Sequence, residues 1–334
     1  MNVTMKDVAL KAGVSKSAVS RTFTEGASVS AKTREKVEAA AKELGFSPNV
    51  LASSLTTRKT KLVGLIVTNF HNPVFLQIFD LFTRLIQQHG LRPLLVNMSG
   101  QTDPDKAMQM LMQYSVDGVI IASSTLPPSF SQAFSKTSVP IVHSFGRCFD
   151  SPTVPTVGVD NRKAGAMVAE FLIQRGYTSF GFLGGPQEAT STQDRLAGFQ
   201  TIIEKYFGIN SVSVSYANDY SFEAGYDAMN KTLKDAPAQV YFCGDDVVSI
   251  GAISAIEHNG LNVPTDIGVI GFNDMEMAGW KNIQLTTVKQ PFSEIVSTSV
   301  SLLVNMLEGY RIDQEPTVIP CTIVHRNTTR ALAE

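Results

Sequence analysis

From residue 62 onwards, short apolar runs alternate with longer amphipathic stretches, and this alternation restricts the fold more than any other feature of the chain. Such a pattern is typical of βαβ units, in which helices cover a parallel sheet. The pattern occurs twice in succession, so it predicts two similar α/β lobes in tandem. The predicted strands are 62–68, 93–97, 117–122, 139–144 and 156–159 in the first set, and 180–183, 212–215, 240–243, 267–271 and 286–289 in the second.

The first 45 residues have a different pattern, which predicts three short helices. Thr4, Ser15 and Ser30 each stand where a side-chain oxygen can cap the first turn of a helix, and Gly13 and Gly45 stand where helices commonly end. The short link at 12–15 is the turn of a predicted helix-turn-helix, in which glycine supplies a backbone conformation that other residues resist.

Charge is divided unevenly along the chain. Residues 1–61 contain 11 Lys and Arg against 5 Asp and Glu, a net charge of +6, whereas the remainder carries 17 positive and 25 negative residues, a net charge of −8. We call residues 1–61 with their basic charge the head side of the chain and the acidic remainder the body. This division favours a polyanionic partner for the basic part alone.

The segment 47–61 joins the two parts. Ser47 and Pro48 favour the start of a fourth helix that runs to Leu55, and a polar tether follows at 56–61. A helix of about two turns is marginal by itself, so we expect it to form only when something packs against it.

Several classes of protein are disfavoured. The three cysteines, Cys148, Cys243 and Cys321, form no C-x-x-C pair, so we expect neither disulfides nor a zinc site, and no cofactor. The start lacks the apolar run of a signal peptide and no stretch is long enough to span a membrane, so we expect a cytoplasmic protein. Hydrolase signatures and a phosphate-binding loop are absent, which argues against an enzyme.

The second predicted helix carries the residues expected to read DNA. In a helix-turn-helix this helix enters the major groove, and its first residues meet the base edges. Lys16 and Arg21 can donate to guanine, and Ser15 and Ser17 can reach bases or phosphates. The alternatives are that Ser15 is only a cap and Arg21 only a solvated charge.

Several segments of the head, taken in their order along the chain, resemble the signature of the lactose-repressor (LacI/GalR) family of bacterial regulators. The similarity continues to near the C-terminus. The matching segments are TMKDVA at 4–9, AGVS at 12–15, VSR at 19–21, VSAKTR at 29–34 and LGFSPN at 44–49. The resemblance implies an all-α helix-turn-helix head and a periplasmic-binding-protein-like α/β body made of two doubly wound parallel-sheet lobes.

The resemblance also implies domain boundaries. The head is expected at 1–46, the hinge helix and linker at 47–61, and the effector-binding and dimerisation domain at 62–334. Within that domain we expect an N-lobe at about 62–160 and 291–320, and a C-lobe at about 161–290 and 321–330.

Residues expected to bind DNA follow from the same resemblance. The hinge helix is expected to fold when two copies pair on a pseudo-palindromic operator, with Leu55 wedged into the minor groove at its centre. The alternative for Leu55 is a buried contact between domains. The full set is Thr4, Ser15, Lys16, Ser17, Ser20, Arg21, Val29, Ser30, Asn49, Ala52 and Leu55.

The resemblance also implies a set of effector-binding residues, and several of them fall in loops that follow the predicted strands, where ligands of parallel sheets bind. Phe75 could pack on a ring, and Arg195 could clamp vicinal hydroxyls or a carboxylate. Asn273 stands where relatives often have aspartate, which leaves the effector's identity open. Asp160 is included, although a helix cap is the alternative role for it. The full set is Phe75, Asp160, Arg195, Tyr220, Asp245 and Asn273.

These observations predict a homodimeric, ligand-controlled transcription repressor that binds operator DNA. We expect a sugar-like effector and a carbohydrate-utilisation operon as the target, with a nucleobase or nucleoside effector as the alternative. Closure of the lobes would alter the pairing of the two hinge helices, although the sequence does not tell an inducer from a corepressor. A solute-binding protein is the other class, and the basic head argues against it.

Overall fold

The computed structural model describes residues 3–24, 26–47, 59–70, 72–98, 103–126, 128–134, 137–148, 154–313 and 315–332. These residues fall into two compact units, a head within 1–60 and a body within 61–334.

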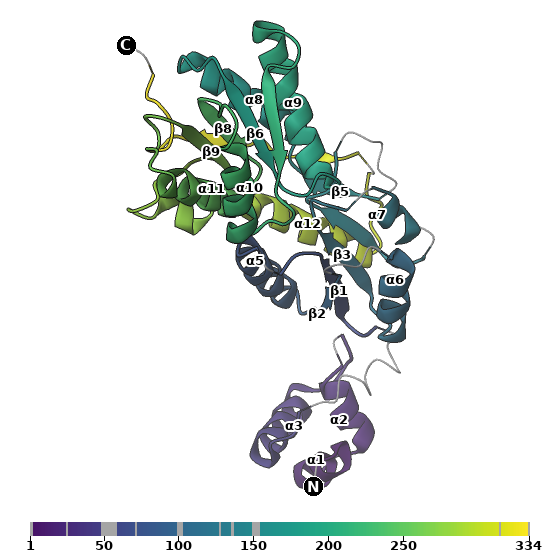
Figure 1. Ribbon diagram of the computed structural model, residues 1–334. Helices are drawn as coiled ribbons and strands as arrows, with labels where there is room; N and C mark the ends of the chain where they lie inside the picture. Colours follow the sequence, from purple (N-terminus) through teal and green to yellow (C-terminus); the bar gives the residue numbers. More distant parts are fainter. Residues whose placement is uncertain are drawn as a thin grey trace. The chain divides into compact units, whose positions relative to one another are not determined.

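The head contains the three predicted helices, α1 (Met5–Ala12), α2 (Lys16–Thr22) and α3 (Ala31–Leu44) (Figure 1). Thr4, Ser15 and Ser30 cap their first turns, and Gly13 and Gly45 end α1 and α3 in the left-handed conformation, with φ of 67° and 66°. The helices share a small core centred on one fully buried valine from each of them, Val8, Val19 and Val37.

The body contains two sheets that were both predicted. Within the described residues, the first is a parallel sheet of six strands in the order β11-β5-β4-β3-β1-β2. Its strands are β1 (Leu62–Val67), β2 (Arg92–Asn97), β3 (Gly118–Ala122), β4 (Ile141–Ser144), β5 (Thr156–Gly158) and β11 (Thr317–Val318). With it pack α5 (Val74–Gln88), α6 (Pro104–Gln113), α7 (Pro128–Phe134) and α12 (Phe292–Leu307), and we call this unit the N-lobe.

The second sheet forms the C-lobe, and within the described residues its six strands have the order β12-β10-β9-β8-β6-β7. Its strands are β6 (Phe180–Gly184), β7 (Val212–Tyr216), β8 (Val240–Cys243), β9 (Gly268–Asn273), β10 (Thr286–Lys289) and β12 (Thr322–Val324). Strand β12 is antiparallel to β10, and the other pairings are parallel. Its helices are α8 (Asn161–Gln174), α9 (Thr190–Phe207), α10 (Phe222–Thr232) and α11 (Asp246–His258), with the 3₁₀ turn η1 (Glu276–Gly279).

All ten predicted strands are present, and the predicted fold class is confirmed. The sequence pattern missed β11 and β12, because each spans only two or three residues that are half-buried or exposed. The chain crosses between the lobes after β5, after β10 and between β11 and β12. A continuous cluster of buried apolar side chains, from Val63 and Ile120 to Phe182 and Phe242, joins the two lobes.

Candidate effector pocket and DNA-binding head

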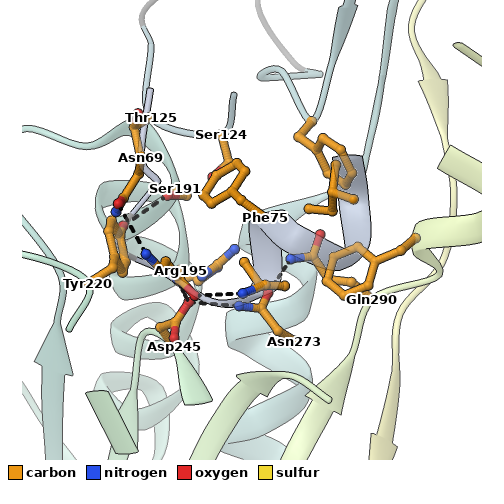
Figure 2. A pocket seen from close by; sticks show the side chains of 15 residues that line it. Asn69, Phe75, Ser124, Thr125, Ser191, Arg195, Tyr220, Asp245, Asn273 and Gln290 are labelled. Carbon is orange, nitrogen blue, oxygen red and sulfur yellow. Dashed lines mark hydrogen bonds between the residues drawn. The ribbon is translucent and has the colours of Figure 1, made fainter. Parts of the chain in front are cut away.

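A pocket lies between the two lobes, at the carboxyl ends of their strands (Figure 2). Its empty volume is about 480 Å³, counting open solvent at its mouth. The N-lobe elements supply Asn69, Asn72, Val74, Phe75, Ile78, Ser124, Thr125, Phe145 and Phe292, and the C-lobe elements supply Ser191, Arg195, Tyr220, Asp245, Asn273 and Gln290.

The structure brings together five of the six predicted effector residues, Phe75, Arg195, Tyr220, Asp245 and Asn273. Asp160 is the exception. Its carboxylate accepts a hydrogen bond of 2.9 Å from the Lys163 amide and caps α8, and it lines a separate groove beside Lys163 and Cys321. The alternative role as a helix cap is therefore the one that the structure shows, because the capping geometry directs the carboxylate to the first turn of α8.

Arg195 is buried in the wall of the pocket, with only 3% of its surface exposed. Its Nε donates to Asn161 Oδ1 at 2.8 Å, and its Nη1 donates to the Gly244 carbonyl oxygen at 2.6 Å. The guanidinium lies 3.4 Å from the centroid of the Phe272 ring, a cation–π contact. Burial lowers the pKa of Arg195, but an arginine remains charged. Both hydrogen-bond acceptors are neutral, and among the described residues no carboxylate forms an ion pair with this cation.

Asp245 is the centre of a polar network that joins the lobes (Figure 2). Its Oδ2 accepts hydrogen bonds of 2.7 Å from Asn72 in the N-lobe and from Asn273 in the C-lobe, and its Oδ1 accepts one of 2.8 Å from the Val247 amide. Asn273 in turn accepts a hydrogen bond of 2.6 Å from Gln290. Burial raises the pKa of Asp245 to about 6. Both carboxylate oxygens are thus occupied by protein donors.

Tyr220 and three phenylalanines form the remaining walls. The Tyr220 hydroxyl lies 3.2 Å from Ser191 Oγ and 2.9 Å from Thr192 Oγ1, and burial raises its pKa. Phe145 and Phe292 pack edge to face with centroids 6.0 Å apart, and Phe75 lies on the pocket wall. Aromatic surface of this kind can cover the flat face of a ring.

Sequence reasoning missed several lining residues, of which Asn72 and Gln290 are the most consequential because both belong to the Asp245 network. Each follows the end of a strand, Asn72 after β1 and Gln290 directly after β10. The rule that ligands bind at the carboxyl ends of parallel strands could have found both.

In the head, Lys16, Ser17, Ser20 and Arg21 are exposed on α2 and Val29 is half-buried. The side chains of Thr4, Ser15 and Ser30 accept capping hydrogen bonds from Asp7, Ala18 and Thr33. Asn49, Ala52, Leu55 and the predicted hinge helix lie outside the described residues. Among the helices that are described, none is long and apolar enough to cross a membrane.

Comparison with known proteins agrees with this architecture. Residues 4–49 match the model of bacterial regulatory proteins of the lacI family, and residues 169–329 match that of a periplasmic-binding-protein-like domain. The chain is 30% identical to the HTH-type transcriptional repressor CytR of Escherichia coli K12 over 98% of this chain and 97% of that protein. It is 33% identical to the HTH-type transcriptional repressor PurR of Proteus mirabilis over 97% and 96%.

Comparison with solved structures also agrees with this architecture. The Lac repressor dimer bound to operator and the anti-inducer ONPF is 28% identical and covers 99% of this chain and 100% of that one, with a TM-score of 0.88. The complex of the regulator CelR with cellobiose is 26% identical, covers 98% and 100%, and has a TM-score of 0.71. The chain therefore belongs to the LacI family of bacterial regulatory proteins, and it is a DNA-binding transcription repressor rather than an enzyme.

Proposed function

We propose that this repressor acts in the cytoplasm as a homodimer whose operator binding is controlled by a small molecule held between the two lobes. The observation that carries the proposal is the pocket itself, because residues of both lobes line it and are hydrogen-bonded across it. A ligand in such a place alters the relative stability of open and closed bodies by its differential affinity for them.

Of the two charged residues that line the pocket, Arg195 is the one left to bind an effector, and it is a donor. Asp245 has both oxygens occupied, whereas Arg195 keeps part of its guanidinium edge beside the pocket and has only neutral acceptors. An effector that presents several acceptor atoms and a ring face for the aromatic walls fits these surroundings. A sugar or sugar derivative meets both requirements and is our preferred class, and an oxo-substituted nucleobase or its nucleoside is the alternative.

For the head, we propose that α2 reads the major groove through Lys16 and Arg21, whose side chains are exposed beside Ser17 and Ser20. Leu55 is proposed as the minor-groove wedge, and Asn49 and Ala52 as further hinge contacts to DNA. Thr4, Ser15, Val29 and Ser30 are proposed to position the head on phosphates.

We propose that the second copy covers an exposed apolar face of the N-lobe. Leu76 on α5 is 71% exposed, and Leu95 on the adjacent edge strand β2 is 49% exposed. Exposed apolar side chains of this size on neighbouring elements are typical of interfaces. The solved Lac repressor dimer shows that a chain of this fold forms a two-fold assembly. Leu76→Asp should shift sedimentation from dimer to monomer, whereas Leu10→Asp in the head should not.

The proposal is tested by operator selection followed by effector screening. The purified full chain is incubated with duplexes that carry randomised inverted repeats, and bound sequences are enriched and measured by fluorescence anisotropy at fixed salt. We expect a pseudo-palindrome to bind at least about a thousandfold more tightly than random duplex. Equal affinity for random and inverted-repeat duplexes, with and without the compounds below, would contradict the repressor mechanism.

Effector screening uses thermal shift with sugars, sugar phosphates, nucleobases and nucleosides. A hit should stabilise the parent protein and change its operator affinity, and Arg195→Ala should remove both effects. Lys163→Ala, in the separate groove beside Asp160, is the matched control and should leave both effects intact. Hits restricted to nucleobases or nucleosides would replace our preferred effector class by the alternative one.

A further inference from the structure

An ion pair away from the effector pocket ties the two lobes together. Arg147 lies in the loop that follows β4 of the N-lobe, and Asp194 lies in the second turn of α9 in the C-lobe. Arg147 Nε donates to Asp194 Oδ2 at 2.7 Å, and Arg147 Nη2 donates to Asp194 Oδ1 at 2.8 Å. This paired geometry is the strongest arrangement open to an arginine and a carboxylate. We call it the interlobe ion pair.

The carboxylate of this pair is buried and depends on Arg147. Only 2% of the Asp194 side chain is exposed, against 19% for Arg147. Among the described residues, the other donor to Asp194 is Arg162 of the same lobe, whose side chain is 59% exposed and whose Nε lies 3.4 Å away. Separation of the lobes would therefore leave a buried charge with one distant, solvated partner, which is unfavourable.

The position of the ion pair sets it apart from two other hydrogen bonds that cross the cleft. The hydrogen bond from Asn72 to Asp245, and that from the Ser191 amide to the Ser124 carbonyl oxygen, are made by residues that line the pocket. An effector that fills the pocket meets those residues directly. Arg147 and Asp194 are not among the described residues that line it, so their bond does not require an effector.

Asp194 also precedes the effector-binding candidate Arg195 on α9. Asn161 and Arg162, at the start of α8, hold Arg195 and Asp194 respectively. An ion pair that holds Asp194 in place therefore also holds the turn of α9 from which the Arg195 side chain reaches the pocket wall.

We propose that Arg147 is a positioning residue: its ion pair with Asp194 holds the body closed in the absence of effector and presents Arg195 to the pocket. The ion pair thereby sets the fraction of molecules that are ready to bind effector, and that fraction scales the apparent affinity. Only the expected effect on effector affinity rests on the proposed effector pocket, because closure of the lobes is measured without effector or DNA.

Hydrogen exchange of one amide reports the closure. Ser191 lies in the first turn of α9, where an amide has no acceptor within the helix, and its hydrogen bond of 3.3 Å goes to Ser124 of the opposite lobe. Its exchange therefore follows opening of the lobes. The Gly244 amide, bonded at 2.8 Å to the Leu183 carbonyl oxygen within the C-lobe, reports whether that lobe remains folded.

The experiment compares Arg147→Ala with Arg162→Ala in the full chain, without effector or DNA. Both variants remove an arginine from Asp194; the Arg147–Asp194 bond joins the two lobes, whereas the Arg162–Asp194 bond lies within the C-lobe. We expect exchange at Ser191 to accelerate about tenfold or more in Arg147→Ala and less than twofold in Arg162→Ala, with Gly244 unchanged in both.

Unchanged exchange at Ser191 in Arg147→Ala, or equal acceleration in the two alanine variants, would overturn the proposal. Should Arg147→Ala expose the Gly244 amide as well, Arg147→Lys replaces it, since lysine keeps the charge and loses the paired geometry. For that variant we expect hydrogen exchange of the Ser191 amide to accelerate about threefold or more while the Gly244 amide stays protected. Exchange of the Ser191 amide at the parent rate would overturn the proposal.

Discussion

Gly198 in α9 is a position where a single added methyl group should disturb the effector site. Helices α8 and α9 pack closely, and a Cβ on Gly198 would lie 1.9 Å from the Arg162 carbonyl oxygen and 2.7 Å from the Arg162 carbonyl carbon. Gly165 on α8 faces the Arg195 carbonyl oxygen in the same way, at 2.1 Å. Both obstacles are backbone atoms, so neither can rotate away.

The displacement caused by Gly198→Ala follows from these distances. Ordinary contact begins at 3.4 Å, so the helices must separate locally by about 3.4 − 1.9 = 1.5 Å. The bond between Arg195 on α9 and Asn161 on α8 is 2.8 Å long and has a margin of only about 0.7 Å before it is lost. Overpacking of this kind costs about 1–3 kcal/mol, and a lost bond to a charged group adds about 1.5–3 kcal/mol. Alanine gains roughly 1 kcal/mol of helix propensity, so the net destabilisation is about 1.5–5 kcal/mol.

The assay is urea and thermal unfolding of the parent and of Gly198→Ala, followed by circular dichroism. A loss of about 1.5–5 kcal/mol should lower the apparent Tm by about 3–20 °C. Ala197→Gly, at the neighbouring half-buried position, measures the propensity effect alone and should cost only about 1 kcal/mol. A Gly198→Ala variant as stable as the parent, or more stable, would refute the reasoning, because propensity by itself favours alanine.

Three further predictions concern DNA and pH. Lys16→Gln should change the ratio of affinities for the preferred half-site and other half-sites by about fivefold or more, while the affinity for random duplex at the same salt changes little, as measured by anisotropy. An equal loss of affinity on every sequence would make Lys16 a phosphate contact. Leu55→Ala should weaken operator binding about tenfold or more without altering thermal stability, and parent-like affinity would remove the wedge. The pKa of Asp245 is raised from 3.8 to about 6, so its contribution to folding is full below pH 3.8 and is lost as pH rises to about 6. In Asp245→Asn, urea unfolding should show a smaller fall in stability over that window, and an unchanged slope would contradict the assignment.

Much of the site was accessible from the sequence because it depends on where strands end. Asp245 and Asn273 follow predicted strands, and parallel topology brings such positions to one edge, whereas Arg195 lies on α9 and was implied by the family resemblance. Asp160 also follows a strand, yet its carboxylate serves α8, because the geometry of a helix cap competes with the pocket for the same side chain. A rule based on position along a strand cannot resolve that competition.

The sequence by itself determined ten of the strands and their grouping into two lobes, and the three helices of the head, because alternating apolar runs, helix caps and left-handed glycines are local patterns that span only a few residues. Only the tertiary structure decided which distant groups meet. Arg147 and Asp194 are 47 positions apart on different lobes, and Asn72 and Asp245 are 173 positions apart. Their pairing depends on the register of two sheets and on how the lobes close, and no local pattern contains that information.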